Sequence, residues 1–246
     1  MALPYTLISD DRSLIGLVVL QSDESIEADM RRILPPSVEL FVSRVPSGMA
    51  VSLQSLGTME TVLTQAASLF PLDARFRVVG YGCTSGTAHI GVARISDLIR
   101  AGTQTDVVTE PVSALVAACK ALEIKRLGLI SPYVAAVSDQ LRAVLAEHGI
   151  IVTAFESFDE AEECKVVRIS PDSIARAAVD LARSGDCDAV FLSCTNLRTL
   201  DIIEDVEQAT GLPVLSSNQV LAWHLLGLSG CKTPLFAPGR LWKAAT

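Results

Sequence analysis

The sequence predicts an α/β protein made of two pseudo-symmetric, doubly wound parallel-sheet halves with a cleft between them. The first observation is an internal repeat, because "LIGLVVLQSDESIEADMRRILP" aligns with "RLGLISPYVAAVSDQLRAVLAEHG", so that Gly16 matches Gly128, 112 residues further along. The second is that a cysteine follows an apolar run in each copy, and Cys83 and Cys194 lie 111 residues apart. The third is the alternation of short apolar runs with amphipathic stretches, which is typical of parallel strands covered by helices.

Each copy is expected to follow the order β-α-β-α-β-α-β-α. After the aligned first strands and helices, the second strands are "VELFVSRV" (38–45) and "IIVTAFESF" (150–158). The second helices are "TMETVLTQAASLF" (58–70) and "SPDSIARAAVDLARSG" (170–185). Beyond the cysteine loops, "VARISDLIRAG" and "LRTLDIIEDVEQATG" end in glycines that suit a helix C-terminus, and "DVVTE", "PVLSS" and two apolar helices complete the copies. We therefore divide the chain into repeats 12–122 and 123–230 and a tail 231–246, with the last helices packing on the first half.

Composition excludes several classes of function. The chain has 246 residues, half of them hydrophobic, which is enough to bury a large core. Its net charge of −8 argues against nucleic acid and anionic membranes as partners. The beginning of the chain has no basic segment followed by a long apolar one, and no stretch approaches ~18 uninterrupted apolar residues. We expect a cytoplasmic protein, and the long apolar helices indicate a homodimer.

The six cysteines are scattered and form neither a CxxC motif nor a Cys/His cluster. We therefore expect no disulfide framework, no metal and no cofactor. Four of them, Cys119, Cys164, Cys187 and Cys231, are interpreted as small buried apolar side chains. The repeated position of Cys83 and Cys194 favours a functional pair instead, and a redox disulfide between them is the lesser alternative in a reducing cytosol.

Both cysteine loops have the composition of a small-acid site. Ligands of parallel sheets bind beyond the carboxyl ends of the strands, which is where Cys83 and Cys194 are expected. A helix N-terminus lowers a thiol pKa below its free value of roughly 8.5, which makes the thiol a nucleophile or a base. Backbone N–H groups together with nearby hydroxyls and an amide form a carboxylate cradle, for which the candidates are Thr84, Ser85, Thr87, Thr195 and Asn196.

These motifs carry a family resemblance. "GCTSGT", "LSCTNLRTLD" and "PVLSSNQVLAW" resemble the paired cysteine motifs of the aspartate/glutamate racemase superfamily, and more narrowly its maleate isomerase branch, which includes arylmalonate decarboxylase. The resemblance covers nearly the whole chain. The decarboxylase keeps only the second cysteine, so the presence of both favours isomerase or racemase chemistry. "VSRVPSG" and "GYGCTSGTA" most resemble the ectoine-utilisation branch, whose products carry amino groups.

The resemblance implies roles for individual residues. Cys83 matches the thiolate that attacks the double bond in maleate isomerases, and Cys194 matches its proton-transferring partner. Tyr133 matches a tyrosine that binds a substrate carboxylate. Ser216, Ser217 and Asn218 match a loop that faces the cleft, with plain capping of the following helix as an equal alternative.

Two departures concern charge. Maleate-isomerising relatives carry "PSSNTT" where this chain reads "LQSDES", so Asp23 replaces an asparagine that binds substrate carboxylate. Relatives also have a neutral segment near the run of Asp159, Glu160, Glu162 and Glu163, which we interpret here as a solvated loop. A carboxylate facing a substrate carboxylate costs about 1–4 kcal/mol, whereas a substrate ammonium group reverses the sign.

The sequence therefore predicts a cofactor-independent isomerase or racemase of a small carboxylic acid, either a maleate-like diacid or an amino acid, with a role in ectoine breakdown. Cys83 and Cys194 are the expected catalytic pair, and Asp23, Tyr133 and Asn218 are among the expected substrate-binding residues. A non-catalytic binding protein for small acids and a malonate-type decarboxylase are the alternatives.

Overall fold

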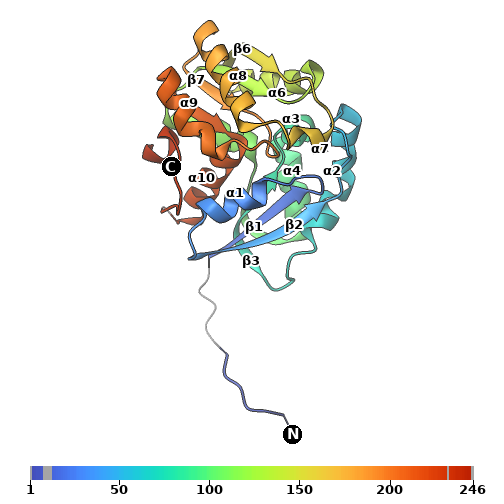
Figure 1. Ribbon diagram of the computed structural model, residues 1–246. Coiled ribbons are helices and arrows are strands. Elements are labelled where there is room, and N and C mark those ends of the chain that lie inside the picture. Colours follow the sequence, from blue (N-terminus) through green and yellow to red (C-terminus); the bar gives the residue numbers. More distant parts are fainter. Residues whose placement is uncertain (1, 8–12, 232, 245–246) are drawn as a thin grey trace.

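The computed structural model describes residues 2–7, 13–231 and 233–244, and it contains two four-stranded parallel sheets. The first has the order β2-β1-β3-β4 and the second the equivalent order β6-β5-β7-β8. The strands are β1 (Ser13–Leu20), β2 (Val38–Val45), β3 (Arg75–Gly82), β4 (Gln104–Thr109), β5 (Arg126–Ser131), β6 (Ile151–Ser157), β7 (Ala189–Leu192) and β8 (Val214–Ser216). The predicted fold class of two doubly wound halves is confirmed (Figure 1).

Helices cover the faces of both sheets. In the first half they are α1 (Ile26–Ile33), α2 (Leu53–Ala67), α3 (Thr84–Ile90), α4 (Val92–Gly102) and α5 (Pro111–Ala121). In the second half they are α6 (Ala135–Glu147), α7 (Glu163–Val166), α8 (Pro171–Ser184), the short η1 (Leu200–Ile202), α9 (Ile203–Thr210) and α10 (Ser217–Ser229), and η2 (Arg240–Lys243) follows in the tail. Helix α2 begins before the predicted residue 58, because Ser52 and Ser55 form a reciprocal capping box.

The two glycines that revealed the repeat lie where neighbouring side chains approach the central strands. A Cβ atom on Gly16 of β1 would lie 2.9 Å from Val79 Cγ2, and one on Gly128 of β5 would lie 2.3 Å from Leu181 Cδ2. Both distances are too short for a real contact, so a larger residue would displace these side chains and the tight packing inside each half favours glycine.

The last helix of each repeat packs on the other half. Leu115 of α5 belongs to a buried cluster with Leu129 of β5 and Phe191 of β7. Leu225 of α10 packs in the cluster that contains the first sheet, close to Gly80 of β3. Helices α5 and α10 also contact each other. Because α5 packs on the second half and α10 on the first, the two halves are held together. The division of the chain between residues 122 and 123 describes the sequence repeat and stays a prediction.

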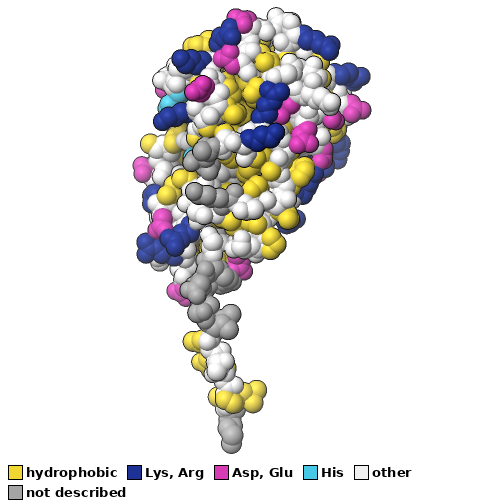
Figure 2. Space-filling view, turned by 90° about the vertical axis from the view of Figure 1, so that its left-hand side faces the viewer, with side chains coloured by type: hydrophobic (Ala, Val, Ile, Leu, Met, Phe, Trp, Pro, Cys, Tyr) yellow, Lys and Arg dark blue, Asp and Glu magenta, His cyan; other side chains and the backbone are white. Residues whose placement is uncertain are grey.

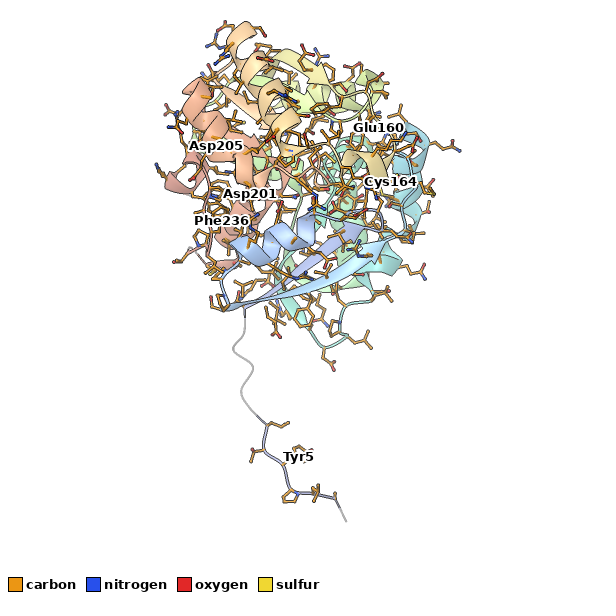
Figure 3. The ribbon with its side chains drawn as sticks, viewed as in Figure 1. Tyr5, Glu160, Cys164, Asp201, Asp205 and Phe236 are labelled. Carbon is orange, nitrogen blue, oxygen red and sulfur yellow. The ribbon has the colours of Figure 1, made fainter. Side chains whose placement is uncertain are left out.

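The tail returns to the first half. The backbone N–H of Leu235 donates to Ile33 O at 2.7 Å, and the guanidinium of Arg32 lies 4.9 Å from the centre of the Phe236 ring. Arg32 also pairs with Asp201 of η1, so α1 contacts both the tail and the second half (Figure 3). In the described part of the chain, no helix is long and apolar enough to cross a membrane. Figure 2 shows basic and acidic side chains interspersed on one face.

Candidate active site

Cys83 lies directly after β3 and caps the N-terminus of α3. Its Sγ accepts a hydrogen bond from the backbone N–H of Gly86 at 3.1 Å. A Cβ atom on Gly86 would lie 2.9 Å from this sulfur and 2.7 Å from the hydroxyl oxygen of Tyr81. Glycine therefore allows the N–H group to approach the thiol, as the sequence "CTSG" permits.

Cys194 occupies the corresponding place after β7 but in a different local structure. Its backbone has a φ of +137°, which is unusual for a residue with a side chain. The next helical segment, η1, begins only at Leu200, so a turn rather than a helix N-terminus surrounds this thiol. Its Sγ accepts from the backbone N–H of Asn196 at 3.3 Å and lies 3.0 Å from the hydroxyl oxygen of Tyr133.

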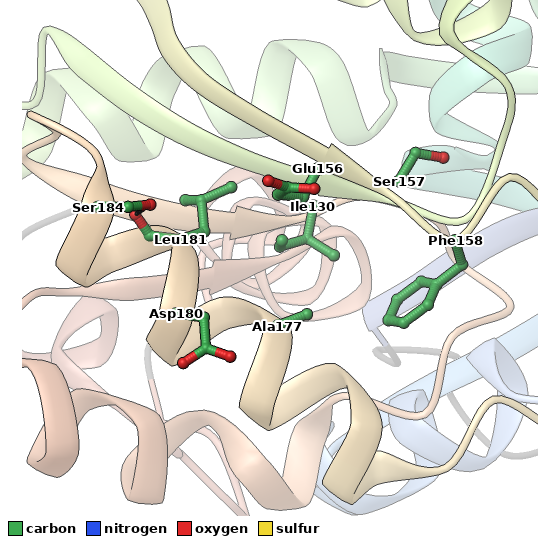
Figure 4. A pocket seen from close by; sticks show the side chains of 8 residues that line it. All are labelled: Ile130, Glu156, Ser157, Phe158, Ala177, Asp180, Leu181 and Ser184. Carbon is green, nitrogen blue, oxygen red and sulfur yellow. Dashed lines mark hydrogen bonds between the residues drawn. The ribbon is translucent and has the colours of Figure 1, made fainter.

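The two thiols share one small cavity of about 10 Å³ between the halves. Its lining residues are Leu20, Asp23, Cys83, Thr84, Ser85, Tyr133, Glu163, Cys194, Thr195 and Asn196. Eight of the ten site residues expected from the sequence therefore come together in one place. A different groove of about 410 Å³ lies between β6 and α8, lined by Glu156 and Asp180 among others, and it contains none of these residues (Figure 4).

Ser217 and Asn218 lie behind the cysteine loops and are not among the residues that line the cavity. The Ser217 hydroxyl oxygen accepts from the backbone N–H of Cys194 at 3.0 Å and lies 2.8 Å from Thr84 Oγ1, so it links the two loops. Asn218 Nδ2 donates to Thr195 O and to Asp29 Oδ2, both at 2.8 Å. These side chains hold the loops in place, and their direct contact with substrate stays a prediction.

Glu163 and the apolar Leu20 are the two cavity residues that the sequence analysis did not select. We interpreted the acidic run that contains Glu163 as a solvated loop, but Glu163 is buried, whereas Glu162 and Cys164 on either side are exposed. Backbone hydrogen bonds from Val51 to Ala161 and from Glu163 to Met49 hold this segment against the first half. The available signal was the i, i+3 spacing of Glu163 and Val166, which places both on the buried side of one helical turn.

Asp23 follows β1, as the repeat predicts, and only one of its oxygens is paired. Oδ1 accepts the backbone N–H groups of Ser25 and Ile26, both at 2.9 Å, at the beginning of α1. Oδ2 is buried and has no hydrogen-bond partner among the described residues. Burial raises the pKa of Asp23 from 3.8 to about 7, and the nearby Glu163 adds to this effect.

Burial also dominates the protonation of the thiols. It raises the pKa of Cys83 to about 12, and the N–H of Gly86 lowers this pKa by a smaller amount. It raises the pKa of Cys194 well above its usual value, and the carboxylate of Glu163 raises it further. The expected lowering of the thiol pKa is therefore wrong, because desolvation of the thiolate outweighs the N–H donors around it.

The cavity is rich in acids and poor in cations. Asp23 and Glu163 line it, and within the described residues no lysine or arginine does. Over the same part of the chain, no three His, Cys, Asp or Glu side chains are grouped so as to hold a metal ion. Among the neutral polar side chains that line the cavity, Thr195 donates its hydroxyl proton to Gly82 O at 3.2 Å. The hydroxyls of Thr84 and Ser85 and the backbone N–H groups are the available partners for a substrate carboxylate.

Two thiols that meet in a polar cavity between pseudo-symmetric α/β halves define a cysteine-dependent enzyme of small acids. The chain belongs to the arylmalonate decarboxylase family, whose model matches residues 59–242. It is thus a cysteine-based isomerase or decarboxylase.

The relatives of the chain include both activities. It is 26% identical over 236 residues to a maleate isomerase of Nocardia farcinica, with 92% of each chain covered. It is 27% identical to the arylmalonate decarboxylase of Bordetella bronchiseptica, with 88% of this chain and 90% of that protein covered. A solved structure of the Nocardia farcinica maleate cis-trans isomerase bound to TRIS superposes with a TM-score of 0.81 at 25% identity, covering 94% of this chain and 97% of that one. The predicted family resemblance is confirmed, and its ectoine branch stays a prediction.

Proposed function

We propose that the protein is an isomerase or racemase of a small carboxylic acid that carries an ammonium group, with Cys83 and Cys194 as the catalytic pair. The observation that carries this proposal is the charge of the cavity. Asp23 and Glu163 both line it, and none of the described lining residues is a lysine or arginine. The relatives named maleate isomerase act on a diacid, for which such a cavity is poorly suited.

The energetics favour an ammonium group over a second carboxylate. Two like charges about 4 Å apart repel by about 4 kcal/mol at an effective dielectric constant of 20, and unlike charges attract by the same amount. The unpaired Oδ2 of Asp23 supplies an acceptor that an ammonium group can satisfy. The single substrate carboxylate then binds the hydroxyls of Thr84 and Ser85.

The pair of thiols supports a two-base reaction. In racemisation, one cysteine takes the α-proton as a thiolate, and the other donates its S–H proton to the opposite face of the carbanion. Each turnover exchanges the protonation states of the two sulfurs and leaves the net charge unchanged. Because Cys83 and Cys194 come from different halves, they can approach a bound carbon from different sides.

The finer assignments remain proposals. A role in ectoine breakdown is supported by the motif resemblance alone. The cytoplasmic location and the homodimer stay predictions from composition.

A substrate panel in deuterated water tests the proposal. Maleate, an arylmalonate, an amino dicarboxylate and a diamino monocarboxylate are compared for isomerisation, carbon dioxide release and α-deuterium incorporation. We expect deuterium incorporation into an amino substrate, and its loss in Cys83→Ser and Cys194→Ser. Efficient isomerisation of maleate without exchange into any amino acid would refute the proposed substrate class, and release of carbon dioxide would favour the decarboxylase.

The Asp23→Asn variant tests the charge argument directly. It should move the ratio of catalytic efficiencies toward maleate, by about tenfold for each 1.4 kcal/mol of repulsion relieved. Because the pKa of Asp23 is about 7, the shift should be larger at pH 8 than at pH 6. The exposed Glu162→Gln removes one negative charge from the same region and serves as the matched control. A ratio that is unchanged in Asp23→Asn at both pH values would contradict the argument.

A further inference from the structure

A chain of hydrogen bonds leads from Cys194 to a buried carboxyl group. The Tyr133 hydroxyl donates to Glu163 Oε1 at 2.6 Å, and Cys194 Sγ lies 3.0 Å from the same phenol oxygen. A phenol has one proton to donate. Since Tyr133 gives its proton to Glu163, its oxygen accepts the S–H of Cys194, and the order of the chain is thiol, phenol, carboxylate.

The structure holds this chain in place from both ends. Asn196 Nδ2 donates to Glu163 Oε2 at 2.6 Å, and the backbone N–H of Asn196 points to Cys194 Sγ at 3.3 Å. The backbone N–H of Glu24 fixes Asn196 in turn by donating to its Oδ1 at 2.9 Å. All three members of the chain are buried. One asparagine therefore supports both the carboxylate and the sulfur.

We propose that Glu163 is the internal proton acceptor that converts Cys194 into its reactive thiolate, acting through Tyr133. In this step the S–H bond of Cys194 breaks and its proton moves to the phenol oxygen. The phenol proton moves at the same time to Glu163 Oε1. The products are a thiolate, a neutral tyrosine and a neutral carboxylic acid, so the network carries one negative charge before and after. The inference rests on the proposed role of Cys194 as a proton-transferring thiol.

The electrostatics of the cavity favour such an internal transfer over loss of the proton to solvent. If Cys194 and Glu163 were both ionised, their charges would repel in a buried site, and this repulsion raises the pKa of Cys194. The other titratable groups that line the cavity are Asp23 and Cys83, and their charged forms are also negative. Moving a proton within the network adds no charge to the cavity, whereas releasing it does.

The test is the pH dependence of Cys194 alkylation, which needs no substrate. Iodoacetamide reacts with the thiolate, and peptide mass spectrometry reads Cys194 and Cys83 separately. In the parent protein, internal transfer gives a thiolate fraction that does not depend on pH, because the total number of protons on Cys194, Tyr133 and Glu163 stays the same. The rate of Cys194 alkylation should therefore change by less than about twofold between pH 7 and 9. In Glu163→Gln the proton must leave to solvent, and the rate should rise about tenfold per pH unit.

Two further variants make the test decisive. Tyr133→Phe interrupts the chain while keeping Glu163, and it should show the same steep dependence as Glu163→Gln. Glu162→Gln is the control, because Glu162 is exposed and pairs with Lys165, and it should keep the flat profile. Two results would overturn the inference. One is a parent protein in which the rate of Cys194 alkylation rises tenfold per pH unit. The other is an equal slope in the parent and in Glu163→Gln, including no rise in either. Failure of α-proton exchange in the substrate panel would instead count against the proposed function and leave these slopes unchanged.

Discussion

Replacing Asp23 by asparagine should remove a pH-dependent loss of stability. The pKa of Asp23 is raised to about 7 in the folded protein, chiefly by burial, from an ordinary value of 3.8. Between these two values the folded state keeps a proton that the unfolded state has lost. The stabilisation from this group is therefore present at low pH and is lost as the pH rises through about 7. Each pH unit in the window changes the free energy of unfolding by about 1.4 kcal/mol, so the change between pH 5 and 7 is about 2–3 kcal/mol.

Urea unfolding of the parent and Asp23→Asn at pH 5, 6, 7 and 8 measures this difference. Asparagine retains a carbonyl oxygen for the N–H groups of Ser25 and Ile26, so the beginning of α1 keeps its cap. Asp29, whose pKa is raised to about 6, is present in both proteins and cancels from the comparison. We expect the stability of the variant relative to the parent to increase by about 2–3 kcal/mol from pH 5 to pH 8. Parallel pH profiles for the two proteins would refute the assigned protonation of Asp23.

Four further substitutions have defined outcomes. Cys83→Ser and Cys194→Ser should each abolish turnover with little change in thermal midpoint, as measured by calorimetry, since serine fills the same space. Ser217→Ala removes the acceptor for the Cys194 N–H and should lower the free energy of unfolding, measured with urea, by about 1–3 kcal/mol. An unchanged free energy of unfolding would show that this hydrogen bond does not stabilise the fold. Gly86→Ala places a methyl group 2.7 Å from the Tyr81 hydroxyl oxygen, so the rate of Cys83 alkylation should change while that of Cys194 does not. Equal effects on the two alkylation rates would contradict a displacement confined to the Cys83 loop.

The sequence repeat predicted the sheets because its anchors have direct structural causes. Gly16 and Gly128 lie where side chains approach central strands, and Cys83 and Cys194 follow the third strand of each half. Because ligands of parallel α/β sheets bind beyond the carboxyl ends of the strands, both thiols are expected at that end of their sheet. The strands and the positions of these glycines and cysteines depend on residues that are close together in the chain. A sequence pattern can therefore predict them.

The remaining features depend on packing between distant segments. Glu163 enters the site because the segment around the start of α7 forms backbone hydrogen bonds with Met49 and Val51 of the first half, and an acidic run gives no indication of that contact. The packing of α5 on the second half is equally invisible in a repeat, because either arrangement buries the same apolar face. The thiol pKa was mispredicted for a related reason, since the N–H donor is local but desolvation requires the whole surrounding structure.

The pseudo-symmetry of the fold places the two thiols, but their surroundings make them chemically different. Cys83 receives one backbone N–H at the beginning of α3 and has the phenol of Tyr81 near it. Cys194 lies in a turn and contacts Tyr133, whose proton is given to a carboxylate. A proton can therefore leave Cys194 without leaving the cavity, and Cys83 has no equivalent acceptor among the contacts described. Since each additional charge in this cavity costs free energy, both sulfurs rest as thiols, and Cys194 is the one that can become a thiolate by internal proton transfer.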